Sequence, residues 1–387
     1  MAVTAAAIGI AKRLNLGSIA ALLLVGMVLG PRSPVPLLAG HVGDLQSVGE
    51  IGVMLLLFLV GLDTQPGRLW SMRSLVLGFG SAAYLAVTVV IAGFLLAVSH
   101  INWQSAIVVG LGLAMSSSAV PLPILQARDE CASSYGRVTI AADIFQSLIV
   151  IPVLALIPLL GTTTEASEQT SDAVRGVRVL AALAGVTLLG RVLLPYCLRI
   201  MARNVGSGAF ALTVFAGVFA AAWIMDEVGI SMALGAFLIG VLLSTSVYAT
   251  QVKAAVTPAR HILLGVFFVA VGMAIDLRQA AVFRAELLFY VANVLIMKIV
   301  VVYGIARAFR IDWRAAALSG LLLMPLDEIG YIIFASAHLH GLLTERAYAL
   351  ALLSISASFL VSPLAINFGL RWLPNPERSG ARALRES

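Results

Sequence analysis

The amino-acid sequence predicts an all-α integral membrane protein, because it carries too few polar side chains to cover a water-soluble fold. Hydrophobic residues make up 60% of the chain and charged residues only 11%, whereas soluble domains carry roughly 25% charged residues. One bilayer crossing takes about 20 apolar residues. The chain of 387 residues therefore has room for about 12 or 13 crossings with short connections and no separate soluble domain.

Apolar runs between polar breaks define the individual spans. The first run is short for a bilayer crossing, and its flanks lack the charged start and cleavage site of a secretory signal. In chain order the predicted spans are residues 2–11, 18–30, 48–62, 75–98, 104–127, 138–160, 176–193, 208–225, 229–245, 259–276, 285–306, 312–336 and 347–370.

The positions of Lys and Arg predict the orientation of these spans. Most of the 25 basic residues fall in alternate connections and in the C-terminal segment. Connections rich in Lys and Arg face the cytoplasm. We therefore expect a multi-pass protein of the inner or plasma membrane. Its transmembrane domain would cover 1–371, and a short basic cytoplasmic tail would cover 372–387 without a regulatory nucleotide-binding domain.

The spans also indicate an internal repeat. The offset that carries Gly61 onto Gly272 also carries Pro152 onto Pro363. Six spans on each side of one intervening span would give the two halves opposite orientations, which is the pattern of inverted-repeat transporters. The predicted parts are a first repeat over about 1–160, a linker helix over about 176–202 and a second repeat over about 208–371.

Two spans in matching positions of these repeats carry helix-weakening residues. One contains the run Met115-Ser116-Ser117-Ser118 followed by two prolines, and the other contains Pro325-Leu326-Asp327-Glu328. Backbone groups released from a helix at membrane depth persist only where they are buried in protein or line a wet cavity. The sequence therefore predicts two interrupted helices that cross near the bilayer midplane and form a site for a small cation. The structural alternative is that these serines and prolines only kink the helices to fit their neighbours.

Ionisable side chains inside spans are costly and usually functional. Asp143 and Ser147 lie four residues apart on one helical face, and Gln146 lies between them. Lys298 falls in the middle of its span, where only the interior of a helix bundle can hold it. Two structural alternatives stay open, namely a carboxylate of Asp143 at the membrane interface and an ion pair that merely anchors Lys298.

Other chemistries find little support in the sequence. Cys131 and Cys197 are too few for a disulfide framework. The five histidines have no metal-ligand spacing on a shared helix, and no hydrolase motif is present. We expect no metal, no cofactor, no nucleic-acid partner and no enzymatic activity.

Several sequence segments together resemble one transporter family, the Kef-type branch of the monovalent cation:proton antiporter-2 family. The similarity runs over nearly the whole chain and includes Gly26-Met27-Val28-Leu29-Gly30-Pro31, Ala114-Met115-Ser116-Ser117-Ser118-Ala119, Leu234-Gly235-Ala236-Phe237-Leu238-Ile239-Gly240 and Phe267-Phe268-Val269-Ala270-Val271-Gly272-Met273. The resemblance implies 13 helices in two inverted repeats, a homodimer, and a scaffold half beside a moving core that carries the ion. Lys298 and Glu328 also fall where the family pattern carries a lysine and a glutamate.

The sequence departs from the family pattern at the position where an aspartate is expected to bind cation and proton in turn. Here Gln146 is followed by Ser147, and a serine hydroxyl does not titrate at a useful pH. Asp143 lies on the same helical face at a distance of ~6 Å along the axis, which makes it the candidate replacement. The candidate cation- and proton-binding residues are Asp143, Gln146, Ser147, Ser116, Ser117 and Ser118, with Lys298, Asp327 and Glu328 as charge partners.

These residues together predict a secondary transporter that exchanges K⁺ or Na⁺ for protons. Two other interpretations stay open. The same fold could carry a solute by symport, or the chain could be a transport-inactive paralogue that serves as a regulatory or assembly subunit.

Overall fold

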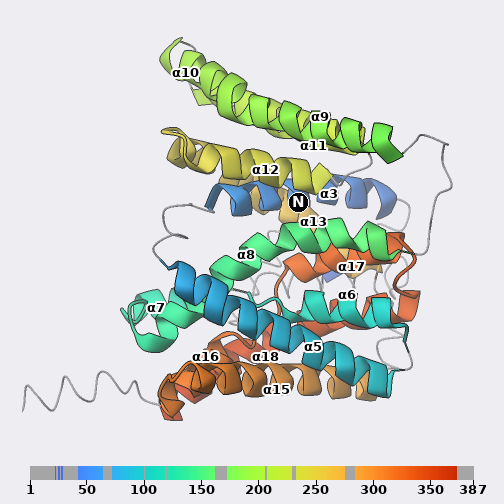
Figure 1. Ribbon diagram of the computed structural model, residues 1–387, viewed down its shortest axis with the longest axis vertical. Coiled ribbons are helices and arrows are strands. Elements are labelled where there is room, and N and C mark those ends of the chain that lie inside the picture. The colour runs from blue at the N-terminus through green and yellow to red at the C-terminus, as the bar shows by residue number, and fades with distance from the viewer. Residues whose placement is uncertain are drawn as a thin grey trace, which may run out of the picture. The chain divides into compact units, whose positions relative to one another are not determined.

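The structure is a computed structural model (Figure 1) in which every regular element of the described part is a helix. This confirms the predicted fold class. Six helices are long and apolar enough to cross a membrane, and four further apolar helices of 10–17 residues lie in the same described part of the chain. The described residues are 22, 25, 26, 28, 42–63, 72–99, 101–117, 120–161, 172–204, 207–228, 232–274 and 284–372.

Some predicted segments lie outside these ranges. They include the span 2–11, most of the span 18–30 and the tail after residue 372. The two inverted repeats remain a prediction.

The chain divides into two compact units that are each built from separate stretches of sequence. Unit 1 takes residues 22–70 and 164–276, and unit 2 takes 71–163 and 277–387, besides short N-terminal stretches in each. Each unit thus draws helices from both predicted repeats.

Unit 1 is held by close approach of helix backbones. Its helices are α3 (Val42–Asp63), α9 (Asp172–Leu188), η3 (Leu189–Leu193, a π-helical segment), α10 (Leu194–Asn204), α11 (Ser207–Asp226), α12 (Met232–Ser244) and α13 (Ala249–Ala274). Where α3 meets α12, a Cβ atom added at Gly61 would collide with the carbonyl oxygen of Phe237, and one added at Gly240 would collide with that of Phe58. Small residues are the usual means by which membrane helices pack closely.

Unit 2 contains both interrupted helices that the sequence predicts. Its elements are η2 (Leu75–Gly80), α5 (Ser81–Val98), α6 (Trp103–Ala114), α7 (Pro121–Ala127), α8 (Ser134–Leu160), α15 (Arg284–Ala308), α16 (Trp313–Leu322), α17 (Ile329–Leu339) and α18 (Glu345–Trp372). The predicted span 104–127 is split into α6 and α7, and the predicted span 312–336 is split into α16 and α17.

The two ends of unit 2 can be told apart by their packing. At one end Leu125 of α7 packs with Leu318 of α16 and Ile366 of α18 in a buried apolar cluster. At the other end the connection between α5 and α6 lies beside the connection between α17 and α18, and residues from both line one hollow. The two breaks lie between these ends (Figure 1).

Substitution of Gly240 tests the close contact in unit 1. We expect Gly240→Ala to lower the apparent melting temperature of the detergent-solubilised protein, since overpacking costs about 1–3 kcal/mol. Gly185→Ala is the matched control, because a Cβ added there meets no atom of the described residues within 4 Å outside its own stretch of helix. Equal melting temperatures for the two variants would contradict the contact.

Candidate functional site

The two helix breaks in unit 2 cross as short extended strands. Ser116 and Leu326 form an isolated antiparallel β-bridge. The Ser117 N–H donates to the Pro325 carbonyl at 3.1 Å, and the Ser116 hydroxyl donates to the Leu323 carbonyl at 2.7 Å. Each break therefore supplies hydrogen-bond partners to backbone groups that have no helical partner in the other break. We call residues 115–117 and 323–328 the crossing.

Lys298 of α15 lies at the crossing and is fully buried. Its ammonium group donates to the carbonyl oxygens of Leu113 at 3.2 Å, Met115 at 2.6 Å and Pro325 at 3.4 Å. The first two carbonyls belong to the end of α6, where a helix leaves its last C=O groups without intrahelical partners. Lys298 therefore links the two breaks through their backbones.

The structural alternative for Lys298 was an anchoring ion pair. None of the ion pairs between described residues includes Lys298. A lysine ammonium group has three N–H donors and no acceptor. In Lys298 these donors are matched by three backbone carbonyl oxygens instead of a carboxylate. The ammonium charge is thus held by oxygen atoms of the kind that also coordinate a small metal cation.

Two further side chains satisfy the N–H groups of the crossing. Gln146 of α8 accepts a hydrogen bond from the Ser116 N–H at 2.8 Å, and Ser358 of α18 accepts one from the Leu326 N–H at 3.1 Å. Both side chains are buried, with 6% of Gln146 and 0% of Ser358 exposed. Gln146 therefore supports the backbone of the break directly.

Carboxylates surround this backbone structure. The Ser117 hydroxyl donates to Glu328 Oε2 at 3.2 Å, and Asp327 Oδ1 accepts the Ile329 N–H at 2.8 Å. The Asp327 carboxylate is also close enough to interact electrostatically with Glu328, Asp143 and Lys298. Three acidic side chains and one ammonium group thus share one neighbourhood inside unit 2.

Asp143 borders a narrow cavity beside the crossing. The cavity has a volume of about 10 Å³, near the ~10–15 Å³ that one water molecule needs. Its polar lining consists of Ser116, Ser117, Thr139 and Asp143. Asp143 is half-buried and is the tenth residue of α8, so it does not lie at the end of its helix.

The other predicted site residues are placed differently. The Ser147 hydroxyl donates to the Asp143 carbonyl of its own helix at 3.0 Å, and Ser147 does not line the cavity. Ser118 lies outside the described residues. Among the described residues, no group of three His, Cys, Asp or Glu side chains could hold a metal ion.

Sequence reasoning missed Ser358 and Thr139. The available signal was the run of serines at 354, 356, 358 and 362 in an otherwise apolar span. Hydroxyl groups at that density favour a helix that faces polar backbone inside the bundle, since lipid offers them no partner.

An apolar helical protein with two crossed, interrupted helices and charged groups at their crossing has the architecture of a secondary transporter. The chain belongs to the sodium/hydrogen exchanger family, because the family model described as "Sodium/hydrogen exchanger, transmembrane" matches residues 1–372. The resemblance seen in the sequence is thereby confirmed.

One curated relative and two solved structures illustrate the similarity. The glutathione-regulated potassium-efflux system protein KefC of Cronobacter sakazakii is 34% identical over 382 residues, which cover 98% of this chain and 60% of that protein. The chain thus spans about three fifths of the length of this relative.

The solved structures are both of the sodium proton antiporter MjNhaP1 from Methanocaldococcus jannaschii. The structure determined at pH 8 matches with a TM-score of 0.69 and 16% identity, covering 96% of each chain. A second, from an electron-microscopy map, matches with a TM-score of 0.60 and 15% identity over 94% of this chain and 92% of that chain. At this level of identity the similarity shows the fold alone.

Two serines of α18 provide a matched test of the crossing. Both are fully buried, but Ser358 accepts the Leu326 N–H, whereas Ser362 Oγ has no hydrogen-bond partner in the described part of the chain. We expect Ser358→Ala to destabilise the protein by about 1–3 kcal/mol, the cost of an unsatisfied buried N–H group. Ser362→Ala should be neutral or stabilising.

The measurement is thermal unfolding of the two purified variants in the same detergent. A loss of stability in Ser362→Ala as large as in Ser358→Ala would contradict the role of Ser358.

Proposed function

We propose that the protein exchanges a monovalent cation, K⁺ or Na⁺, for protons across the membrane. The observation that carries this proposal is the crossing, where backbone carbonyls, three carboxylates and a buried ammonium group converge. Oxygen ligands of this kind suit a small cation, and titratable groups beside them suit a proton. Membership of the sodium/hydrogen exchanger family supports the same activity.

Asp143 is the proposed exchanging acid. Its side chain lines the small cavity together with Ser116, Ser117 and Thr139, so a cation held there would meet one carboxylate and three hydroxyl groups. When Asp143 is deprotonated it binds the cation, and when it is protonated it releases the cation. Because proton and cation compete for one group, neither is carried without displacing the other.

Ser147 and Gln146 have subordinate roles in this proposal. Ser147 cannot titrate, and its hydroxyl is bonded to its own helix. Gln146 holds the Ser116 N–H and so fixes the backbone that lines the site. Asp327 and Glu328 supply negative charge at the second break.

Lys298 competes with the transported cation. Its ammonium group donates to carbonyl oxygens of both breaks, and a second positive charge beside it is repelled at close range. A cation therefore binds most readily when the carboxylates around Lys298 are ionised, which links cation binding to loss of a proton.

The arrangement of basic residues supports a cytoplasmic C-terminus. In unit 2, Arg128, Arg137, Arg310 and Arg314 belong to the end that contains the Leu125 cluster, and α18 also finishes at that end. The positive-inside rule assigns this end to the cytoplasm. The proposed homodimer rests on the family resemblance alone.

The direct test uses purified protein in liposomes that enclose a pH-sensitive dye and hold a preset proton gradient. Addition of potassium or sodium salts should restore the dye signal with the wild-type protein. We expect Asp143→Asn to reduce this recovery to the level of empty liposomes, since the amide does not titrate. Asp129→Asn is the matched control, because Asp129 is an exposed loop residue with a φ of 55° that asparagine also adopts readily.

The outcomes separate the roles of the acids. Full recovery in Asp143→Asn would move the exchanging group to Asp327 or Glu328, to be tested by Asp327→Asn and Glu328→Gln. Failure of folded wild-type protein to respond to either cation would overturn the antiport proposal.

A further inference from the structure

One buried carboxylate of unit 2 lies outside the candidate site. Glu130 is only 2% exposed, although it belongs to the short connection between α7 and α8, residues 128–133, which we call the α7–α8 turn. Its neighbour Asp129 is exposed. A charged side chain is rarely buried unless it is paired and hydrogen-bonded, so the contacts of Glu130 indicate what holds it inside the protein.

Glu130 is bonded to both helices that flank the α7–α8 turn. Its Oε2 atom accepts hydrogen bonds from Arg128 Nε at 2.7 Å and from the hydroxyl group of Tyr135, in the first turn of α8. The Glu130 N–H donates to the Leu125 carbonyl of α7 at 2.9 Å, and the Glu130 carbonyl accepts the Ser133 hydroxyl at 2.6 Å. Glu130 therefore fastens the end of α7 to the start of α8.

The two helices that Glu130 joins supply most of the wall of the Asp143 cavity. The lining residues from α7 are Pro121, Leu122 and Leu125, and those from α8 are Thr139, Ile140 and Asp143. The other lining residues belong to the crossing, which is fixed by hydrogen bonds of its own. The width of this cavity therefore depends on how closely α7 lies against α8.

Short series of hydrogen bonds connect Glu130 to both walls. On the α7 side, Leu125 accepts the Glu130 N–H through its carbonyl and lines the cavity. On the α8 side, the Tyr135 hydroxyl donates to Glu130, and the Tyr135 carbonyl accepts the Thr139 hydroxyl at 2.8 Å. The Tyr135 ring is only 1% exposed and packs in the Leu125 cluster, so it cannot move without disturbing that cluster.

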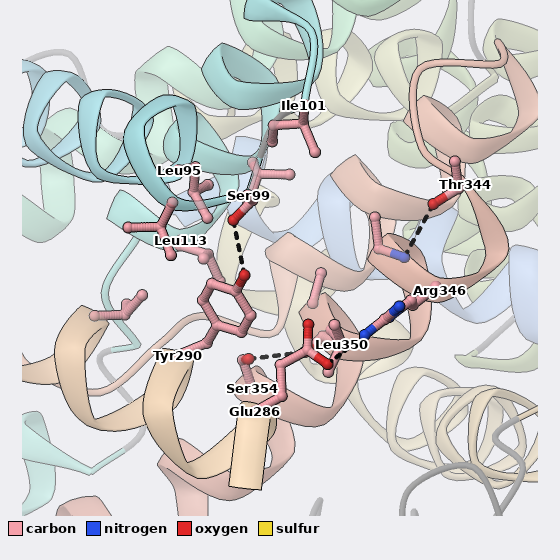
Figure 2. Close-up of a pocket in the computed structure, with 15 residues that line it drawn as sticks. Leu95, Ser99, Ile101, Leu113, Glu286, Tyr290, Thr344, Arg346, Leu350 and Ser354 are labelled. Carbon is pink, nitrogen blue, oxygen red and sulfur yellow. Dashed lines mark hydrogen bonds and ion pairs between the residues drawn. The ribbon is translucent and has the colours of Figure 1, made fainter. Parts of the chain in front are cut away.

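The Asp143 cavity is small enough for its width to matter. A cavity lined by residues of α5, α6, α15 and α18 (Figure 2) has a volume of about 380 Å³, whereas the Asp143 cavity has about 10 Å³. A cation that enters so small a space exchanges its water shell for oxygen atoms of the wall. The size of such a cavity and the arrangement of its oxygen ligands decide between ions of equal charge.

We propose that Glu130 is a positioning residue that sets the width of the Asp143 cavity and thereby the discrimination between Na⁺ and the larger K⁺. The inference rests on the proposed function, since it concerns the cation that the proposed site takes. Glu130 does not touch the ion. It acts through Leu125 and Thr139, which it holds at a fixed separation by bonding the ends of their helices together.

The first test measures ion discrimination in the liposome experiment. The measured quantity is the initial rate of dye recovery with K⁺ divided by the rate with Na⁺, at one subsaturating concentration. We expect Glu130→Ala to raise this ratio roughly tenfold, since a misplacement of about 1 Å can cost on the order of 10²-fold at a site built for one geometry. Tyr135→Phe removes one hydrogen bond of Glu130 and keeps the ring, so it should raise the ratio less.

Gly240→Ala is the control for lost stability alone. Its contact lies within unit 1, so it should lower both rates together and leave their ratio unchanged. If Glu130→Ala does not fold, Tyr135→Phe is judged by the same measurement.

The second test measures the width of the cavity without transport. In a background of Cys131→Ser and Cys197→Ser, which removes both native thiols, Thr139→Cys places a thiol in the cavity wall at a position that is 4% exposed. We expect Glu130→Ala to speed its reaction with methyl methanethiosulfonate at least roughly tenfold, since a closed wall reacts only through local opening.

Ser356→Cys is the control for general loosening of unit 2. Ser356 is buried in α18 and hydrogen-bonded to Tyr331, so Glu130→Ala should leave its reaction rate unchanged. Equal acceleration at Thr139→Cys and Ser356→Cys would overturn the inference, because Glu130 would then only stabilise the fold.

Two other outcomes would overturn the inference. One is an unchanged labelling rate of Thr139→Cys in folded Glu130→Ala. The other is faster labelling with an unchanged ratio of K⁺ to Na⁺ rates, because the width would then not decide between the cations. Failure of the wild-type protein to respond to either cation would instead overturn the proposed function, and the labelling experiment would still show whether Glu130 sets the width.

Discussion

The structure of unit 2 depends on one requirement, that backbone N–H and C=O groups inside a bilayer must find partners within the protein. Two helices lose their regular backbone hydrogen bonds at the breaks, and contacts at the crossing supply other partners. The Ser117 N–H is bonded to the Pro325 carbonyl, while Gln146 and Ser358 accept the remaining N–H groups of the bridge. The ammonium group of Lys298 donates hydrogen bonds to carbonyl oxygens of both breaks. Gln146 and Lys298, which the sequence suggests as site residues, are thus hydrogen-bonded to the backbone of the interrupted helices.

This support makes the chemistry of the site possible. Helix breaks expose carbonyl oxygens that a regular helix would use internally, so a cation can be bound without a dedicated set of acidic side chains. Charged groups at this depth are expensive unless they compensate one another. Lys298 lies within electrostatic range of Asp327 without a direct ion pair between them. Its charge therefore offsets part of the negative charge of the carboxylates and leaves them available to a proton or a cation.

The sequence predicted the parts of this structure that are encoded locally. Serines and prolines marked the first helix break, and a proline beside two carboxylates marked the second. A lysine inside an apolar span had to face the interior of the bundle. The partners of these groups could not be predicted, because they depend on how helices far apart in sequence approach each other. Ser358 contacts Leu326 across 32 residues, and Ser147, which shares a face with Asp143, turns its hydroxyl to the helix backbone instead. The cavity lined by residues of α5, α6, α15 and α18 left no local signal, because each of these helices looks ordinary in sequence.

The origin of the contacts at the crossing has a mechanical consequence. They come from α6, α8, α15, α16 and α18, all of which belong to unit 2. Distortion of any one of these helices would strip hydrogen bonds from the others in an environment that offers no water to replace them. The crossing is therefore rigid, although both helices are interrupted there. A conformational step that carries the site relative to the bilayer would have to move these helices together as a rigid body, with bending confined to the connections outside unit 2.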